Sequence, residues 1–593
     1  MQFKKLTAMA ATVLAGLTIG LVPGAAPASA SVGPGEDRQI SSPASWWTYT
    51  GVDAAYVTGR LSANGARLTD IKVEGGSPLK FTVTMVRNTG VYASGWRWYY
   101  GLTSAQVLST ASANSARPIA IHGYNTTSGL RFAVVMVSNT GANAEAWSFV
   151  YGTPALISSK VTSAKRIVSF GRIQGTGYYT ALFGSNTGTD ATGWYYYYGR
   201  STAQLQSLAA TNGARLVDLD RNNDNGLYNA VMYKNPAGTK WRFYTGYSAA
   251  GLLNKAAQDG QRLFDITPYY VGTTKYFAAV GVSNLTALEN QLDGQIASKL
   301  DSGTHGFYLK QVGGGQVAGL LQTRQFEPAS SLKVLYHLKS TDAEESGTTT
   351  DTTAISYHYN PSASTDGNIC PNSYATTAAT NLKNADSLMM WNSDNRMTRG
   401  ILEKYGKPSM LSLASSIGLT GTSINHNIGC PTSSTHNLTT LSDLGKVYEA
   451  FQNGSVVSSA TWRANFRARM LNQGNTGFKT SICPIVQQEA TKLGKSSAVA
   501  TSFCNAITWI SKGGSYQYGV AYPYTVDWSG ASLTGLPFKS GSVVSPKYFT
   551  FGYFVNGLQL NSDAEKTSVS TALGTLYPAA LRPQINAALK SGW

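Results

Sequence analysis

The sequence predicts a multidomain α+β protein in which an array of small repeated units precedes a larger domain built on an antiparallel sheet. The chain has 593 residues, enough for two or three domains with substantial cores. A tryptophan motif recurs about every fifty residues, and it does so in the N-terminal half. All four cysteines lie in the C-terminal half. These observations indicate two regions of different construction.

The first 45 residues are expected to hold a secretory signal and a linker. Lys4 and Lys5 precede an apolar run that extends to about Val22, and Ala28 to Ala30 fit a signal-peptidase site. We expect residues 1–30 to be removed, residues 31–45 to form a linker, and the protein to be secreted. Later apolar runs are shorter than the ~18 residues that a membrane span needs, so no membrane span is expected.

Residues 46–284 are predicted to form five repeats with the order strand–helix–strand–strand. Each repeat opens with the pattern Trp-x-x-x-x-Gly, and consecutive tryptophans are 47 to 51 residues apart. An Ala/Leu/Gln-rich helical segment follows the glycine, and two apolar strands follow the helix. A period of this length is typical of stacked or ring-arranged units. The five tryptophans are Trp46, Trp96, Trp147, Trp194 and Trp241.

The recurring aromatic and arginine residues each allow two interpretations. The Trp and Tyr positions are expected to pack between neighbouring units, because one repeat cannot bury its apolar face alone; an aromatic platform for sugars is the alternative. An arginine recurs 19 or 21 residues after each tryptophan. Pairing with a carboxylate or helix end of its own unit is favoured over ligand binding. The arginines are Arg67, Arg117, Arg166, Arg215 and Arg262.

The net charge of +17 favours a soluble surface or attraction to acidic polymers. An anionic cell-wall polymer or glycan is a candidate partner for the repeats. Nucleic acid is not expected, because the chain is predicted to be exported and no basic run is longer than a pair.

The cysteine pattern predicts two disulfides and no metal site. An even number of cysteines in an exported chain favours disulfides, and four cysteines allow three pairings. We expect Cys370–Cys430 and Cys483–Cys504, because the second pair is close in sequence. The cysteine spacings do not match zinc sites and the six histidines are scattered, so neither a metal nor a cofactor is expected.

Residues 285–593 are predicted to form the second domain, a mixed antiparallel sheet flanked by helices. A helix is expected over 285–300, a hairpin around Gly313–Gly315, and a final helix from Thr567. Residues 520–541 are predicted to form a long loop before a strand at 548–558.

Three short motifs in this domain could together support a serine nucleophile. Ser330 and Lys333, in Phe326–Lys333, would lie one helical turn apart, so the lysine could take the serine proton once burial lowers its pKa. Ser331 lacks such a partner, because Val334 lies three residues after it.

The second and third motifs lie on a loop and a strand. Ser393-Asp394-Asn395 stands between two helix-like runs and offers a hydroxyl and an amide. Lys512-Gly513-Gly514-Ser515 lies on an alternating apolar strand, where glycines let a substrate backbone approach the strand edge. The backbone N–H groups of Ser330 and Ser515 are a candidate oxyanion hole.

The three motifs together resemble the serine β-lactamase and penicillin-binding-protein superfamily, and are most similar to the class A pattern. The resemblance implies that Ser330 is the acylated nucleophile and Lys333 its base. It further implies that Ser393 relays a proton, that Asn395 binds the substrate amide and that Lys512 completes the third motif. The Trp-x-x-x-x-Gly units resemble the tandem repeats of polyglycine hydrolases, which are secreted serine proteases.

Two departures from the class A pattern affect the expected activity. Gly513 stands where the family has threonine, which removes a hydroxyl for a substrate carboxylate; Ser515 could compensate. Residues 404–442 contain no Asp or Glu, although a class A β-lactamase carries its deacylating glutamate in the corresponding loop. His426 in that loop is a candidate base or, as favoured here, a surface histidine. Asp394 is expected to be a structural carboxylate.

The sequence therefore predicts a secreted serine hydrolase that acts on amide bonds through a Ser330 acyl-enzyme, with a peptide or peptidoglycan-like substrate. A polyglycine hydrolase-like peptidase is favoured. A β-lactamase, or a D-amino-acid peptidase or esterase, is the first alternative. A cell-wall or surface binding protein with a vestigial hydrolase domain is the second.

Overall fold

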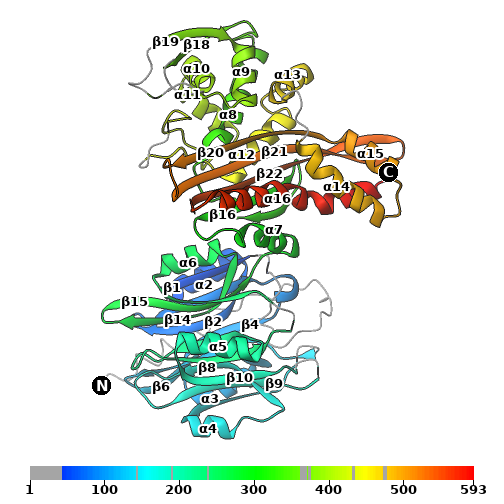
Figure 1. Cartoon of the computed structure of the whole chain (residues 1–593). Coiled ribbons are helices and arrows are strands. Elements are labelled where there is room, and N and C mark those ends of the chain that lie inside the picture. The colour runs from blue at the N-terminus through cyan, green and yellow to red at the C-terminus, as the bar shows by residue number, and fades with distance from the viewer. Residues whose placement is uncertain are drawn as a thin grey trace. The chain divides into compact units, whose positions relative to one another are not determined.

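The structure is a computed structural model of the whole chain, and it describes residues 43 and 45–593 except 142–143, 189–190, 237–238, 361–369, 371–375, 431–434 and 472–476 (Figure 1). The predicted signal peptide and nearly all of the predicted linker lie outside the described residues. These residues form two compact units, one comprising residues up to 252 with 262–282 and the other comprising 253–261 with 283–593. No described helix is both long and apolar enough to cross a membrane.

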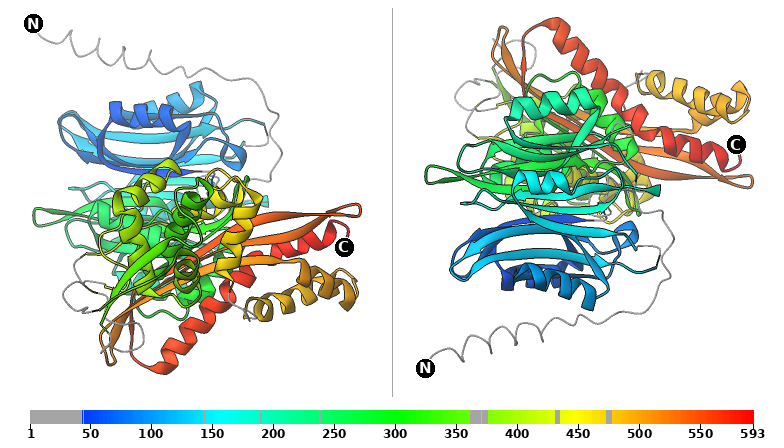
Figure 2. Two further views of the ribbon diagram at one scale, coloured as in Figure 1. Left: turned by 90° about the horizontal axis from the view of Figure 1, so that it is seen from above. Right: turned by 90° about the horizontal axis from the view of Figure 1, so that it is seen from below.

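The first unit contains small three-stranded antiparallel sheets that repeat along the chain, with a helix after the first strand of each; residues 253–258 of the last helix are assigned to the second unit (Figures 1 and 2). Within each sheet the third strand of the repeat lies between the first two. The elements are β1 (Trp46–Asp53), α2 (Ala54–Asn64), β2 (Ala66–Gly75), β3 (Lys80–Arg87); β4 (Trp96–Leu102), α3 (Ser104–Ala113), β5 (Ala116–Thr126), β6 (Gly129–Ser138); β7 (Trp147–Gly152), α4 (Pro154–Ser159), β8 (Lys165–Arg172), β9 (Tyr179–Ser185); β10 (Trp194–Arg200), α5 (Thr202–Asn212), β11 (Ala214–Arg221), β12 (Tyr228–Lys234); β13 (Trp241–Tyr247), α6 (Ala249–Gln258), β14 (Gln261–Val271) and β15 (Thr274–Ser283).

The glycine of the tryptophan motif recurs because the backbone bends there from strand into helix. Gly51 has a φ of 67° and Gly101 a φ of 75°, in the left-handed region that favours glycine. The pairing register of β1 with β3 and of β4 with β6 shifts at these positions. Two residues later, Asp53 and Thr103 cap the following helices with their side chains.

The aromatic side chains of the motif pack between neighbouring repeats, which confirms the favoured interpretation. Phe81 of the first repeat contacts Trp98 and Tyr100 of the second, with ring centroids 5.7 and 5.2 Å apart. Phe132 of the second repeat contacts Phe149 and Tyr151 of the third in the same manner. These two interfaces therefore bury Phe81 and Phe132, which a single repeat would leave exposed.

The recurring arginines are buried within this unit. Arg117 and Arg166 both pair with Glu145, at 3.3 and 3.2 Å, whereas the Arg67 Nε donates to the backbone oxygen of Tyr92. The Arg262 guanidinium donates to the Tyr92 hydroxyl. The contacts of Arg67 and Arg117 lie within their own repeats, as predicted, whereas Arg166 and Arg262 also make contacts across repeats.

The last repeat contacts the first, so the array closes on itself. Lys72 Nζ lies 3.4 Å from Asp265 and 3.6 Å from Asp70, and the Thr84 hydroxyl donates to the Phe264 backbone oxygen. Burial by itself lowers the pKa of Lys72, but the surrounding carboxylates raise the pKa above its ordinary value. A buried ion cluster thus joins strands that are far apart in sequence.

Carboxylates around this cluster also accept hydrogen bonds from backbone N–H groups on the edge strands of the sheets. β8 and β11 are edge strands, and their unpaired N–H groups face the next repeat. The Phe170 N–H donates to Asp218 at 3.0 Å, and the Leu219 N–H donates to Asp265 at 2.7 Å. Edge donors are therefore paired by side chains, which protects them from pairing with another chain.

The second unit contains a five-stranded antiparallel sheet with the order β17-β16-β22-β21-β20. Figure 1 shows α16 along one face of this sheet and the cluster around α8 and α12 on the other. The elements are α7 (Ala287–Ala297), β16 (Thr304–Gln311), β17 (Gln316–Leu320), η5 (Ala329–Leu332), α8 (Lys333–Glu345), β18 (Ala354–Tyr359), β19 (Thr376–Asn381), α9 (Leu382–Trp391), α10 (Asn395–Tyr405), α11 (Lys407–Ser416), α12 (Leu441–Gln452), α13 (Ala460–Met470), α14 (Gly477–Lys492), α15 (Ser497–Ala506), β20 (Thr508–Tyr518), β21 (Tyr524–Ser540), β22 (Val543–Leu560) and α16 (Asp563–Lys590).

The predicted loop at 520–541 is wrong for most of its length, because residues Tyr524–Ser540 form strand β21. Its Gly, Ser and Pro content is typical of a loop, yet β21 pairs with β20 on one side and with β22 on the other. Pairing on both sides overrides local propensity. The predicted helices at both ends of the unit and the hairpin at Gly313–Gly315 are confirmed.

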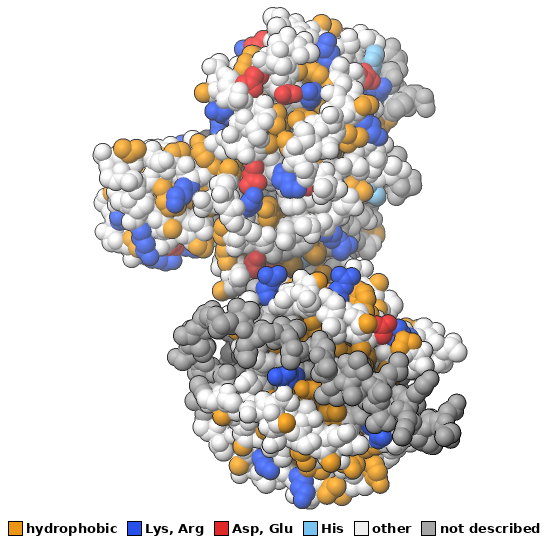
Figure 3. Space-filling model, turned by 180° about the vertical axis from the view of Figure 1, so that it is seen from behind, with side chains coloured by type: hydrophobic (Ala, Val, Ile, Leu, Met, Phe, Trp, Pro, Cys, Tyr) orange, Lys and Arg blue, Asp and Glu red, His pale blue; other side chains and the backbone are white. Residues whose placement is uncertain are grey.

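Both predicted disulfides are present, Cys370–Cys430 and Cys483–Cys504. The second disulfide joins α14 to α15. On the face in Figure 3, lysine and arginine side chains are scattered rather than gathered into one patch.

We predict that Lys72→Met destabilises the first unit by about 3–5 kcal/mol, because it leaves buried carboxylates without their cation. Hydrogen exchange of amides in β2 and β14 in the full chain would measure the loss. Lys80→Met is the matched control: Lys80 is 37% exposed and pairs with Asp53 on the surface, so its loss should cost about 1 kcal/mol or less. Equal exchange rates in the two variants would contradict the role of the cluster.

Candidate active site

The predicted nucleophile lies in a short 3-10 turn that leads into α8. Ala329 has a φ of 47°, an unfavourable conformation for a non-glycine residue, and it turns the chain so that Ser330 begins a helical segment. The backbone N–H of Lys333 donates to the Ser330 carbonyl, so the two residues lie one turn apart as predicted. Ser331 is fully buried, and its hydroxyl donates to the Pro328 oxygen.

The Lys333 amino group is buried and surrounded by oxygen atoms of the second motif. Its Nζ lies 2.6 Å from the Ser393 backbone oxygen, 2.7 Å from Asn395 Oδ1 and 3.1 Å from Ser393 Oγ. A neutral lysine amine has two N–H groups, which the two carbonyl oxygens can accept, and one lone pair. That lone pair is then available to a hydroxyl proton.

The second motif depends on a strained residue and a helix cap. Ser393 has a φ of 57°, which places its hydroxyl and its carbonyl on the same side as Lys333. Asp394 caps α10 by accepting from the Arg396 and Met397 N–H groups, and its carboxylate pairs with Arg396. Asp394 therefore has the structural role that the sequence predicts.

Lys512 extends the lysine–serine contacts from the sheet. It lies on β20, and its Nζ donates to Ser393 Oγ and to the Gly513 oxygen, both at 3.0 Å. Burial lowers the pKa of Lys512 to about 8. Ser393 Oγ therefore lies between two amino groups, within hydrogen-bonding distance of each, and can pass a proton between them.

The glycine pair on β20 has two different surroundings. A Cβ on Gly514 would lie 2.4 Å from the Ser330 nitrogen and 2.6 Å from the Pro328 oxygen, so the strand and the nucleophile turn are in direct backbone contact. A Cβ on Gly513 would meet only the Ser529 oxygen, at an ordinary 3.6 Å. The packing of β20 against the nucleophile turn thus requires a glycine at position 514. It does not require one at position 513.

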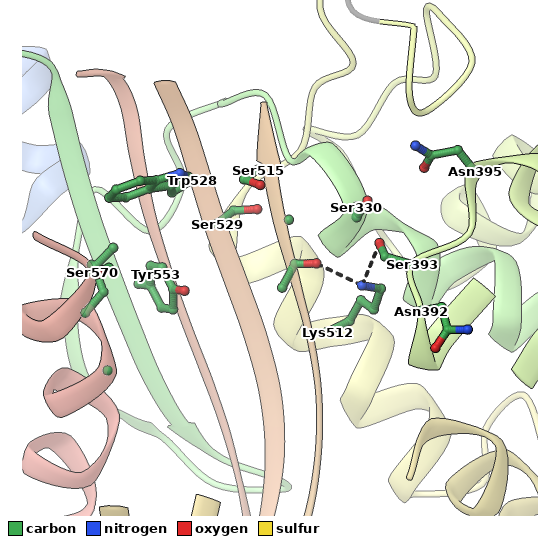
Figure 4. A pocket seen from close by; sticks show the side chains of 14 residues that line it. Ser330, Asn392, Ser393, Asn395, Lys512, Ser515, Trp528, Ser529, Tyr553 and Ser570 are labelled. Carbon is green, nitrogen blue, oxygen red and sulfur yellow. Dashed lines mark hydrogen bonds between the residues drawn. The ribbon is translucent and has the colours of Figure 1, made fainter. Parts of the chain in front are cut away.

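The predicted residues other than Lys333 line one cavity of about 550 Å³, and Lys333 lies behind that lining, in contact with Ser393 and Asn395. Figure 4 shows Ser330, Ser393 and Lys512 close together on one side of the sheet strands, and Trp528 and Tyr553 on the other. The cavity thus continues from the three motifs past the edge strand towards α16. Its lining residues are Ser330, Asn392, Ser393, Asn395, Lys512, Gly513, Gly514, Ser515, Trp528, Ser529, Tyr553, Ser570, Leu573 and Gly574.

The arrangement contains the groups that acyl transfer to a serine hydroxyl would use. Ser330 and Ser393 supply hydroxyls, Lys333 and Lys512 supply amino groups that can hold or release a proton, and the Asn395 amide can bind a substrate. The oxyanion hole from the Ser330 and Ser515 N–H groups stays a prediction. Both residues line the cavity.

Sequence analysis did not identify Glu327, and it favoured the wrong position for His426. Glu327 is 2% exposed and lies three residues before Ser330. The favoured interpretation of His426 as a surface histidine is wrong, because its side chain is 7% exposed and faces Glu327 at 3.0 Å. The sequence shows that a carboxylate, Glu327, stands directly before Pro328. It does not show that His426, 99 residues away, is the partner of that carboxylate.

Comparison with known proteins supports a β-lactamase-like class. Residues 287–502 match a family described as "Beta-lactamase enzyme family". The match includes Ser330, Ser393 and Asn395 and ends before Lys512. No curated protein matches the chain.

Several solved structures are similar over half of the chain. A β-lactamase from Sphaerobacter thermophilus is 17% identical and aligns over 50% of this chain and 95% of its own, with a TM-score of 0.35. PBP-A is also 17% identical, over 50% and 97%, with a TM-score of 0.36. A β-lactamase from Chitinophaga pinensis is 13% identical, over 50% and 99%, with a TM-score of 0.36.

The site and the family match together support a serine hydrolase of the β-lactamase-like superfamily as the class of the second unit.

We predict that Gly514→Ala lowers the reactivity of Ser330 by roughly 100-fold or more, because the new Cβ would clash with the Ser330 backbone nitrogen, a donor of the predicted oxyanion hole. The labelling rate with a fluorophosphonate, followed by intact mass, would measure the loss. Gly513→Ala is the matched control and should change the rate only a few-fold. Similar losses in both variants would contradict the close approach of β20 to the nucleophile turn.

We also predict a pH-dependent stability contribution from Lys512. An unfolded lysine has a pKa of about 10.4, so folding releases a proton between pH 8 and that value. The unfolded state then binds more protons, and stability rises with pH across this window by up to about 3 kcal/mol. Urea unfolding with pulse proteolysis at pH 7 and pH 10 would show this rise. It should be absent in Lys512→Met and retained in Lys383→Met, which alters a lysine that is 65% exposed.

Proposed function

We propose that the second unit hydrolyses amide bonds through an acyl-enzyme on Ser330, and that its substrate is an extended peptide segment, as in polyglycine hydrolases. The observation that carries this proposal is the contact of both Lys333 and Lys512 with one hydroxyl, that of Ser393, beside Ser330.

The proposed reaction uses these groups in sequence. The neutral Lys333 amine takes the Ser330 proton, and Ser330 Oγ attacks the substrate carbonyl. Ser393 passes a proton to the leaving nitrogen as the amide C–N bond breaks, and Lys333 replaces that proton. Water then attacks the ester carbonyl, which frees the acid and restores the Ser330 hydroxyl.

The extended-peptide specificity is supported by the glycines at the sheet edge. Gly513 pairs with Gly530 across β20 and β21, so two adjacent positions lack side chains. Trp528 and Tyr553 line the cavity beyond them, on the α16 side. A chain with small side chains could therefore cross the edge strand with both ends outside the site. A substrate that ends in a free carboxylate meets no hydroxyl at Gly513.

A β-lactamase is the second candidate, and the family match of residues 287–502 favours it. The two candidates differ in deacylation. Residues 404–442 contain no Asp or Glu, so the carboxylate that class A enzymes use to activate water is missing from that segment. We therefore propose that a penicillin acylates Ser330 but is released slowly.

We predict a lasting single adduct in an intact-mass time course of the protein with penicillin G, and none in Ser330→Ala. Capped glycine-rich peptides should be cleaved, with a loss of at least about 1,000-fold in the same variant. Rapid return of unmodified protein with hydrolysed penicillin would favour a β-lactamase. Cleavage confined to peptides with a free terminal carboxylate would favour a carboxypeptidase. Neither adduct nor cleavage would favour a binding protein.

A further inference from the structure

A buried carboxylate links the nucleophile turn to a distant loop. Glu327 Oε1 accepts from the Ala329 N–H at 3.1 Å, within the strained turn that presents Ser330. Glu327 Oε2 accepts from the Asn437 N–H at 2.8 Å and faces His426 Nε2 at 3.0 Å. The side chain of Glu327 is 1% exposed, so these contacts replace water almost completely.

Each nitrogen of the His426 ring faces an oxygen acceptor, and the Asn437 amide nitrogen lies 3.5 Å from Nδ1. Its Nε2 faces the Glu327 carboxylate, and its Nδ1 faces the Asn427 backbone oxygen at 2.9 Å. Two oxygen acceptors are satisfied together when both ring nitrogens carry a proton. Burial lowers the pKa of His426, but the hydrogen bonds to Glu327 and Asn427 raise the pKa above its ordinary value overall. In this form His426 has no lone pair, so it is not the base for a deacylating water.

The His426 loop also supports the Lys333 site. Gly429 lies directly against Asn395, since a Cβ on Gly429 would lie 2.6 Å from Asn395 Nδ2. The Gly429 N–H donates to the Tyr516 hydroxyl at 2.8 Å, and Tyr516 lies on β20 with Lys512. The next residue, Cys430, is held by its disulfide to Cys370. The loop is therefore held by His426 at one end and by the Cys430 disulfide at the other, and Gly429 between them packs on Asn395.

We propose that the Glu327–His426 ion pair is a positioning element for catalysis, which holds the Ser330 turn and the Asn395–Lys333 contact in register with each other. This inference rests on the proposed function, in which Ser330 is the nucleophile and Lys333 its base. Neither residue touches the substrate. Loss of either charge frees the turn and the loop to move separately.

The ion pair makes the arrangement sensitive to pH. The groups that face it are His436, whose Nδ1 is 3.5 Å from Glu327, Tyr516, whose ring is near His426, and the Tyr518–Asp527 pair beside His436. Because the pKa of His426 is raised, its stabilising charge is fully present below the ordinary pKa of histidine and is lost as pH rises through the raised pKa.

The test compares fluorophosphonate labelling and hydrogen exchange in Glu327→Gln, His426→Gln and wild-type full-length chains. We expect at least tenfold slower labelling in both variants and faster exchange in peptides covering 327–333 and 424–430. The high-pH fall in wild-type labelling that His426 causes should be absent from His426→Gln, whereas any fall due to Lys512 remains. His305→Gln breaks a similar pair with Asp293, at 2.9 Å, between α7 and β16, and should change neither readout.

A double variant separates positioning from stability. Glu327→Leu with His426→Leu leaves no unpaired buried charge, so its melting temperature should recover relative to Glu327→Gln while labelling stays slow. Labelling that recovers together with stability overturns the inference, as does a wild-type rate in both single variants. If the wild type is not labelled at Ser330, the proposed function fails, and the exchange data alone then decide the inference: unchanged exchange in both peptides overturns it.

Discussion

The active site depends on holding one amino group out of water. Lys333 is fully buried, and the oxygens of Ser393 and Asn395 surround its Nζ. The two carbonyl oxygens lie within hydrogen-bonding distance of Nζ and can fix its orientation. Three structural features serve this arrangement: the left-handed φ of Ser393, the Asp394 cap that begins α10 at Asn395, and the packing of Gly429 against Asn395. The proposed role of Lys333 as a base therefore depends on the fixed backbone around it.

The sheet supplies the second constraint. β20 is an edge strand, and Gly514 brings its backbone into direct contact with the Ser330 turn. This contact places Lys512 beside Ser393 and leaves Gly513 open to the cavity. The first unit is stabilised differently. Its small sheets are held together by aromatic side chains and buried ion pairs at the interfaces between repeats.

Features that depend on residues close together in the sequence can be predicted from it. The Ser330–Lys333 turn, the loop at Ser393–Asn395, the strand at Lys512 and the recurring tryptophan motif can all be read from short segments. Prediction from the sequence fails where partners are distant. Glu327 and His426 are 99 residues apart, so neither residue alone indicates the ion pair. β21 resembles a loop in composition and becomes a strand only because two neighbours pair with it. Arg166 reaches a carboxylate of the preceding repeat, which no pattern within its own repeat reveals.

The central claim is that Lys333 activates Ser330, and the fluorophosphonate labelling rate of Lys333→Met tests it most directly. Methionine is close to lysine in shape and has no proton-accepting amine, so the buried site should remain filled. The account predicts a loss of labelling by roughly 1,000-fold or more at neutral pH, with the melting temperature nearly unchanged. Labelling at the wild-type rate would contradict the account, since Ser330 would then need another base.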